Sequence, residues 1–218
     1  MDVSLETIVL WAVPVVFAIT LHEAAHGYVA KLFGDRTAEM LGRITLNPLK
    51  HIDPVGTILV PGMLLALAWV NRSPPFVFGW AKPVPVNFGN LKNPKRDMIW
   101  VAAAGPGSNF LQALLWAFAL AATAPSGPLP SAGFFEMADI GFKVNLVLMA
   151  LNLLPLPPLD GGRVLAGLLP GNASTILSRL EPYGFFIILA LLALGVLDDL
   201  MRPLIRVAAS LIARIIGI

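Results

Sequence analysis

Long uncharged stretches separated by short charged segments are the main pattern along this 218-residue chain. Several of these stretches approach the roughly 20 apolar residues that a helix needs to cross a bilayer, and the longest must include a turn. The pattern predicts an all-α polytopic membrane protein with about five to six transmembrane or re-entrant helices. The uncharged stretches are residues 7–21, 54–71, 98–135, 144–159, 164–178 and 182–197.

Glycine, proline and charged residues divide this pattern into helices and breaks. The first helix should begin near Leu5 and stop at Gly34-Asp35. A proline-rich segment, residues 155–158, interrupts the chain just before Asp160, where another helix should open. The expected helices lie at about 5–33, 97–122, 134–154, 160 onward and 183–200, followed by a C-terminal helix.

Two segments lack helical periodicity and should be extended. Residues 42–46 have the pattern of a short strand, and residues 76–87 carry alternate prolines that exclude a regular helix. Extended backbone at membrane depth is stable only where protein buries it or water reaches it. Residues 55–70 should form a span or a re-entrant helix, so that residues 55–91 leave one side of the membrane and return to it.

Composition supports a membrane location. Hydrophobic residues make up 57% of the chain and charged residues 13%, and the mean hydropathy is +0.78. A soluble chain has about a quarter charged residues. The net charge of +2 fits basic loops beside a membrane and gives no reason to expect a nucleic-acid partner. Zero cysteines exclude disulfides and thiolate ligands, and acidic residues near the N-terminus indicate a first helix that is retained.

Charge also indicates how the chain is oriented. Ten of the fifteen basic residues fall at one set of helix ends, and acidic residues such as Asp2 and Glu136 fall at the other. The positive-inside rule then places the N-terminus outside and the basic ends in the cytoplasm, with the protein expected in the cell membrane. The ten residues are Lys31, Arg36, Arg43, Lys50, Lys82, Lys92, Lys95, Arg96, Arg163 and Arg179.

A metal-binding pattern lies near the cytoplasmic end of the first helix. His22 and His26 are four residues apart, so they share a helix face and can bind one divalent ion. Glu23 would face the open coordination position, and its alternative role is a helix-face salt bridge. His22 lies roughly 26 Å along the helix from Leu5, in the far third of a hydrocarbon core about 30 Å thick. The pattern indicates a zinc hydrolase inside a membrane.

The two histidines need a partner, because catalytic zinc usually takes three protein ligands and a water. Asp160 is either that ligand, since a lone aspartate at membrane depth is otherwise costly, or an N-cap. Asn152 either holds substrate or an oxyanion, or makes a helix–helix hydrogen bond. His51 is either a loop or interface residue or a catalytic one.

Two motifs give the chain a resemblance to a known family. His22-Glu23-Ala24-Ala25-His26 is similar to HExxH, and residues 152–162 are similar to NxxPxxxLDG. These are the paired signatures of the site-2 protease family of intramembrane zinc metalloproteases. Residues 105–109 also resemble the family's core, and the whole resemblance spans roughly residues 5–165.

The resemblance implies a peptidase mechanism. One Zn²⁺ per chain would be held by His22, His26 and Asp160. Glu23 would take the proton of a zinc-activated water that attacks a peptide carbonyl, and later pass it to the leaving amine. Asn152 would assist catalysis. The expected substrates are proteins with transmembrane or signal-peptide-like segments in the lipid bilayer, cut within or near it.

The resemblance further implies a single integral-membrane metalloprotease domain over residues 1–218, in a compact form without a PDZ or CBS domain. Its catalytic core would be about 5–165 and its C-terminal helices about 183–218. Residues 42–46 would either add a strand to unwound substrate or cover a helix end. The competing classes are a metal- or ion-transporting protein and a catalytically inactive membrane-binding protein; clustering of polar residues at one depth and the intact Glu23 argue against them.

Overall fold

The computed structural model describes residues 5–70, 72 and 79–217, and the regular secondary structure among them is entirely helical, with no strand. The all-α prediction is confirmed for this part of the chain. Short helical turns η1 (Pro48–Lys50), η2 (Pro54–Leu59), η3 (Phe88–Asn90) and η4 (Glu181–Tyr183) join several of the longer helices. The α-helices, which include the single-turn α2, are α1 (Leu5–Leu32), α2 (Thr37–Met40), α3 (Val60–Val70), α4 (Pro94–Thr123), α5 (Ala132–Asn152), α6 (Asp160–Leu168), α7 (Gly171–Ser178), α8 (Gly184–Ala193) and α9 (Val196–Ile216).

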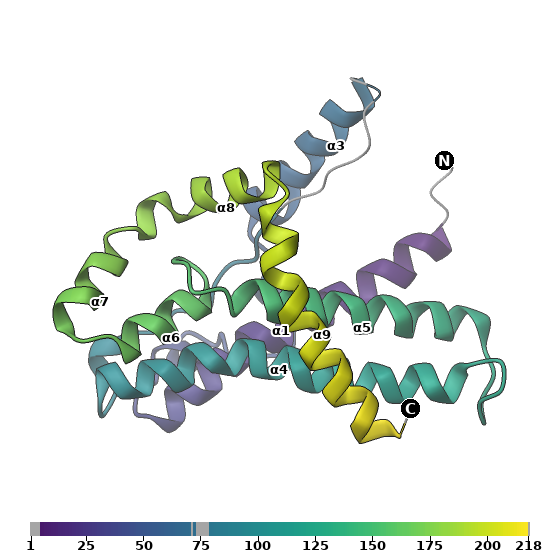
Figure 1. Cartoon of the computed structure of the whole chain (residues 1–218), viewed down its shortest axis with the longest axis horizontal. Coiled ribbons are helices and arrows are strands. Elements are labelled where there is room, and N and C mark those ends of the chain that lie inside the picture. The colour runs from purple at the N-terminus through teal and green to yellow at the C-terminus, as the bar shows by residue number, and fades with distance from the viewer. Residues whose placement is uncertain (1–4, 71, 73–78, 218) are drawn as a thin grey trace.

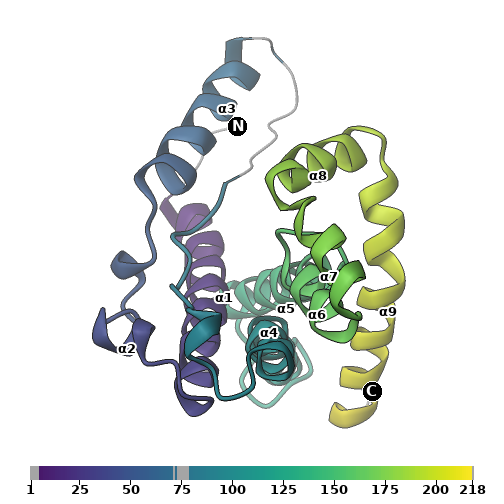
Figure 2. The ribbon, with the colours of Figure 1, turned by 90° about the vertical axis from the view of Figure 1, so that its left-hand side faces the viewer.

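Helices α1, α4 and α5 form the centre of the molecule. α4 packs against α1, α5 and α6, and α9 crosses in front of α4 and α5 (Figure 1). The second view places α1 on one side of α4 and α9 on the other (Figure 2). Small side chains let these helices approach closely. The larger core cluster consists of Ala113, Ala117, Leu146, Met149, Ala150, Leu154, Ile188, Leu197, Met201, Ala208 and Ile212.

Among the described residues, two helical stretches are long and apolar enough to cross a membrane. They are Leu5–Leu32 and Gly171–Ala193, the latter comprising α7, η4 and α8. The predicted count of five to six spans is therefore not confirmed. α3 has only 11 residues, and α4 and α5 carry polar residues such as Asn109 and Asn145, which lower their hydropathy but are buried between the helices.

The strand predicted for residues 42–46 is not observed, because this segment forms a turn and bends. Its backbone hydrogen bonds do not go to a neighbouring strand. The Gly42 and Arg43 amides donate to carbonyls at the end of α2, and the His51 ring lies 3.1 Å from the Thr45 carbonyl oxygen. Residues 79–87 have no regular secondary structure, in agreement with their prolines. The rest of the predicted extended segment, residues 76–78, lies outside the described residues, as does part of the expected 55–91 path.

Residues 79–92, which we call the strap, run beside the second half of α1. Asp35, just after α1, accepts hydrogen bonds from the Asn87 amide at 2.7 Å and from Thr37 and Asn90. Burial alone raises the pKa of this carboxyl, but these hydrogen bonds outweigh burial and hold the pKa below its ordinary value. Asp35 therefore remains an anion at neutral pH and fastens the strap to the end of α1.

Candidate metal centre

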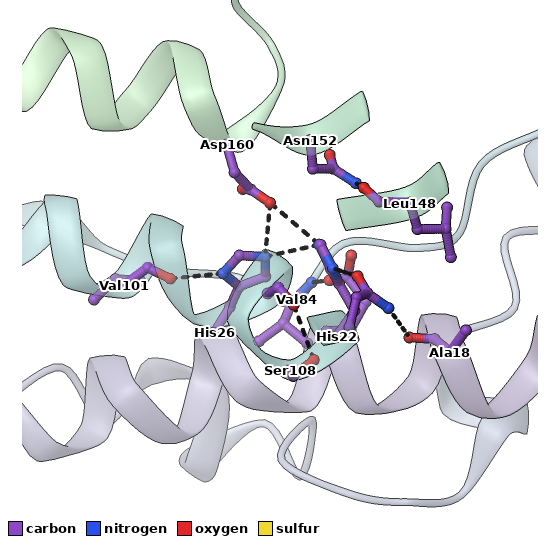
Figure 3. Close-up of polar contacts among 12 residues, drawn as sticks. Ala18, His22, His26, Val84, Val101, Ser108, Leu148, Asn152 and Asp160 are labelled. Carbon is purple, nitrogen blue, oxygen red and sulfur yellow. Dashed lines mark hydrogen bonds and ion pairs between the residues drawn. The ribbon is translucent and has the colours of Figure 1, made fainter. Parts of the chain in front are cut away.

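Three side chains from two distant segments converge where α1, α4 and α6 meet. The Nε2 atoms of His22 and His26 are 3.1 Å apart, and they lie 3.2 Å and 3.3 Å from Asp160 Oδ2 (Figure 3). The side chains are only 10%, 12% and 8% exposed, respectively. Within the described part of the chain, these three form the one group of histidines and carboxylates close enough to share a metal ion.

The hydrogen bonds of the two rings place a proton on each Nδ1 atom, and in a neutral imidazole Nε2 then carries the lone pair. His26 Nδ1 lies 2.7 Å from the carbonyl oxygen of Val101, which can only accept, so this nitrogen is the donor. His22 Nδ1 lies 2.6 Å from Asn109 Oδ1. The Asn109 amide donates its hydrogens to the Ala18 carbonyl and to Asn145, so its oxygen must be the atom that faces His22. Each Nε2 therefore presents a lone pair to the centre.

Three lone pairs facing one another need a cation. Asp160 Oδ2 is buried and has no hydrogen-bond donor among the described residues. Ligands bound to tetrahedral zinc at about 2.0–2.1 Å are about 3.3 Å apart, close to the separations of these donor atoms. Two neutral imidazoles, each donating its other nitrogen to a fixed acceptor, and one carboxylate form a ligand set that suits zinc.

The start of α6 fits the ligand reading of Asp160 better than the cap reading. The helix has no side-chain capping hydrogen bond, and Asp160 is its first residue. Gly161 and Gly162 press against the preceding turn, where a Cβ atom on either would lie 2.4 Å from backbone atoms of Leu153 or Pro157. These glycines let α6 begin close enough for the Asp160 carboxylate to reach the histidines.

Asn109 and Asn145 orient His22 through a buried chain of hydrogen bonds. Asn145 donates to the Gly141 carbonyl at 2.9 Å, which leaves its oxygen free to accept from Asn109 at 2.9 Å. Both side chains are fully buried. The sequence included Asn109 in the stretch that resembles the family's core, residues 105–109, but did not predict this contact. An asparagine within an apolar helix, four residues after Gly105, was the available sign of a buried polar contact. Nothing in the sequence identified Asn145 on α5 as its partner.

Gly105 on α4 lies directly against the two rings. A Cβ atom there would be 2.4 Å from His26 Nε2 and 2.6 Å from His22 Nε2. We expect Gly105→Ala to weaken zinc binding about 10- to 100-fold, because the methyl group would displace rings that are held on their other side by hydrogen bonds. Zinc bound per chain, measured by metal analysis during titration with a competing chelator, tests this expectation.

Gly107→Ala is the matched control for that measurement. A Cβ atom at Gly107 meets no atom within 4 Å, although the residue lies on the same helix two positions away. Alanine also favours helix over glycine at both positions, so the two variants share that stabilising effect. Equal zinc affinity of the two variants would show that α4 does not pack against the metal centre at Gly105 as described.

The remaining predicted site residues, Glu23, Asn152 and His51, each have a hydrogen-bond partner outside the three converging side chains. Glu23 Oε2 accepts a hydrogen bond from the Val84 amide of the strap at 2.6 Å, and in the described part of the chain Glu23 forms no ion pair. Asn152 turns its amide back along α5 to the Leu148 carbonyl at 3.0 Å (Figure 3). His51 is buried on the Thr45 carbonyl and does not join the cluster.

Comparisons with known proteins bear on what this centre does. The family model described as peptidase family M50 matches residues 122–195. "Putative zinc metalloprotease YwhC" of Bacillus subtilis (strain 168) is 37% identical over 207 residues, which cover 93% of this chain and 89% of that protein. "Putative zinc metalloprotease Rip2" of Mycolicibacterium smegmatis is 31% identical, over 80% of this chain and 63% of that protein. No solved structure matches significantly.

Proposed function

Since the chain belongs to peptidase family M50 and is a membrane-associated zinc metalloprotease, we propose that it cuts membrane-anchored proteins within or near the bilayer. The observation that carries this proposal is the convergence of three metal-ligating atoms, two histidine nitrogens and one carboxylate oxygen, in the second half of the apolar helix α1. We assign His22, His26 and Asp160 as the zinc ligands. Zinc held there would polarise a peptide carbonyl and make water a stronger acid.

The chain's own groups then complete the reaction. We assign Glu23 as the general base, because it directly follows the first ligand on α1 and its carboxylate forms no ion pair among the described residues. Its carboxylate takes a proton from the attacking water and passes it to the leaving amine. We assign Asn152 to substrate contact, since its nitrogen bonds to the Leu148 carbonyl and none of the described residues donates to its amide oxygen.

We also propose that α4 and α5 cross the membrane with α1. α4 has 30 residues and α5 has 21, both long enough for a span, and their polar residues Asn109 and Asn145 face each other instead of lipid. α1 ends and α4 begins at the same end of the molecule, and α6 also ends there, where Lys95 donates to the Leu169 carbonyl (Figure 1). Ten basic residues belong to segments near that end, so we assign it to the cytoplasmic side and the N-terminus to the outside of the cell membrane.

The proposal is tested with purified protein in liposomes that also contain a substrate with one transmembrane segment. We expect cleavage in or beside that segment, its loss after treatment with a zinc chelator, and its return when Zn²⁺ is restored. A soluble peptide with the same cleavage sequence is the matched control and should be cut far more slowly. Equal rates on the two substrates would exclude a membrane-directed protease, and cleavage that persists without metal would exclude the assigned chemistry.

A further inference from the structure

Arg43 is a buried cation outside the metal centre. Only 8% of the residue is exposed, although arginine rarely lies buried without a charged partner. Its Nη2 donates to the carbonyl oxygens of Lys82 at 2.9 Å and Pro83 at 3.3 Å, and its Nε has no partner among the described residues. A buried guanidinium held by two neighbouring carbonyls is costly, which suggests that it has a task beyond stability.

The two carbonyls belong to the residues just before the one that binds Glu23. Val84 donates its amide to Glu23 Oε2 at 2.6 Å and is itself 7% exposed. Pro83 and Pro85 have no amide hydrogen, so Val84 is the one backbone donor between Lys82 and Val86. On the other side, the Lys82 amide donates to the His51 carbonyl at 2.9 Å. The strap is thus fixed on both sides immediately before Val84.

We propose that Arg43 is a positioning residue for the general base. By holding the carbonyls of Lys82 and Pro83, it fixes the direction in which the Val84 amide points, and this amide holds one oxygen of the Glu23 carboxylate. The second oxygen is then free to take the proton from water. This inference rests on the proposed function, because it requires Glu23 to act as the base.

The direct test compares two variants of Val84. Val84→Pro deletes the amide hydrogen and suits the backbone, because a residue before proline already favours the extended conformations that proline adopts. Val84→Ala removes side-chain packing but keeps the amide. We expect Val84→Pro to lower kcat about tenfold to a hundredfold, as for one lost hydrogen bond to a charged group, with KM and zinc content unchanged. Val84→Ala should keep most of the activity.

Arg43 is tested in the same assay. We expect Arg43→Ala to lower kcat about tenfold to a hundredfold with zinc still bound, and Arg43→Lys to recover part of the loss, since an ammonium group can reach one of the two carbonyls. Because both substitutions act through one hydrogen bond, the double variant Arg43→Ala/Val84→Pro should be no slower than the slower single variant. A purely structural role for Arg43 would instead give multiplied losses.

Several results would overturn the assignment. They are full activity in Val84→Pro, equal losses in Val84→Pro and Val84→Ala, or multiplied losses in the double variant. If Arg43→Ala does not fold, Arg43→Lys replaces it, alone and combined with Val84→Pro. Failure of the proposed function is distinguishable, because Glu23→Gln would then remain active, whereas failure of this inference alone leaves Glu23→Gln inactive and gives one of the three results above.

Discussion

Glu23→Gln is expected to reduce kcat for peptide cleavage by about 10²- to 10⁴-fold while zinc remains bound. Glutamine has the same shape, and its amide oxygen can still accept the Val84 hydrogen bond that the carboxylate accepts at 2.6 Å. The substitution removes the ability to take a proton from water and leaves the proposed ligands intact. Cleavage of a membrane-anchored substrate and zinc content are measured on the same preparation.

Glu39→Gln provides the control for this substitution. Glu39 forms ion pairs with Lys31 and Arg36 on the surface near the end of α1, and surface pairs of this kind contribute about 0–1 kcal/mol to stability. We expect the control to keep its cleavage rate. If Glu23→Gln cuts at a rate near that of the unaltered protein, Glu23 is not the base and the proposed mechanism is wrong.

The sequence could predict the parts of the centre that depend on local geometry. Two histidines four residues apart on a helix must share a face, and the Nε2 atoms of His22 and His26 are indeed 3.1 Å apart. An aspartate before two glycines could be either a ligand or a cap. The choice depends on how closely α6 approaches α1 and α4, which spacing along the chain does not encode.

Contacts between distant segments could not be predicted from the sequence, because spacing along the chain does not determine how those segments pack. The Asn109–Asn145 pair depends on the rotation of α4 against α5, and the contact between Val84 and Glu23 depends on where an irregular segment comes to rest. The strand predicted at residues 42–46 failed because β-propensity needs a neighbouring strand to be expressed, and none of the described residues supplies one.

Asp160→Ala is expected to leave a purified protein with almost no bound zinc and no measurable cleavage. The carboxylate is the only anion among the three converging side chains, and a site of two neutral imidazoles has too few ligands and no charge to hold the ion. The helix should survive, because Asp160 makes no capping hydrogen bond that its loss would break. Circular dichroism in detergent checks the helix content, and metal analysis checks the zinc.

Asp139→Ala is the appropriate comparison for Asp160→Ala. Asp139 lies on α5 and pairs with Lys143 at 2.6 Å on the surface, so its replacement removes an aspartate without touching the metal centre. Zinc content and cleavage should both be retained there. Full zinc content in Asp160→Ala would exclude this residue as a ligand. Loss of helix content together with zinc would instead indicate that Asp160 is needed mainly to start α6.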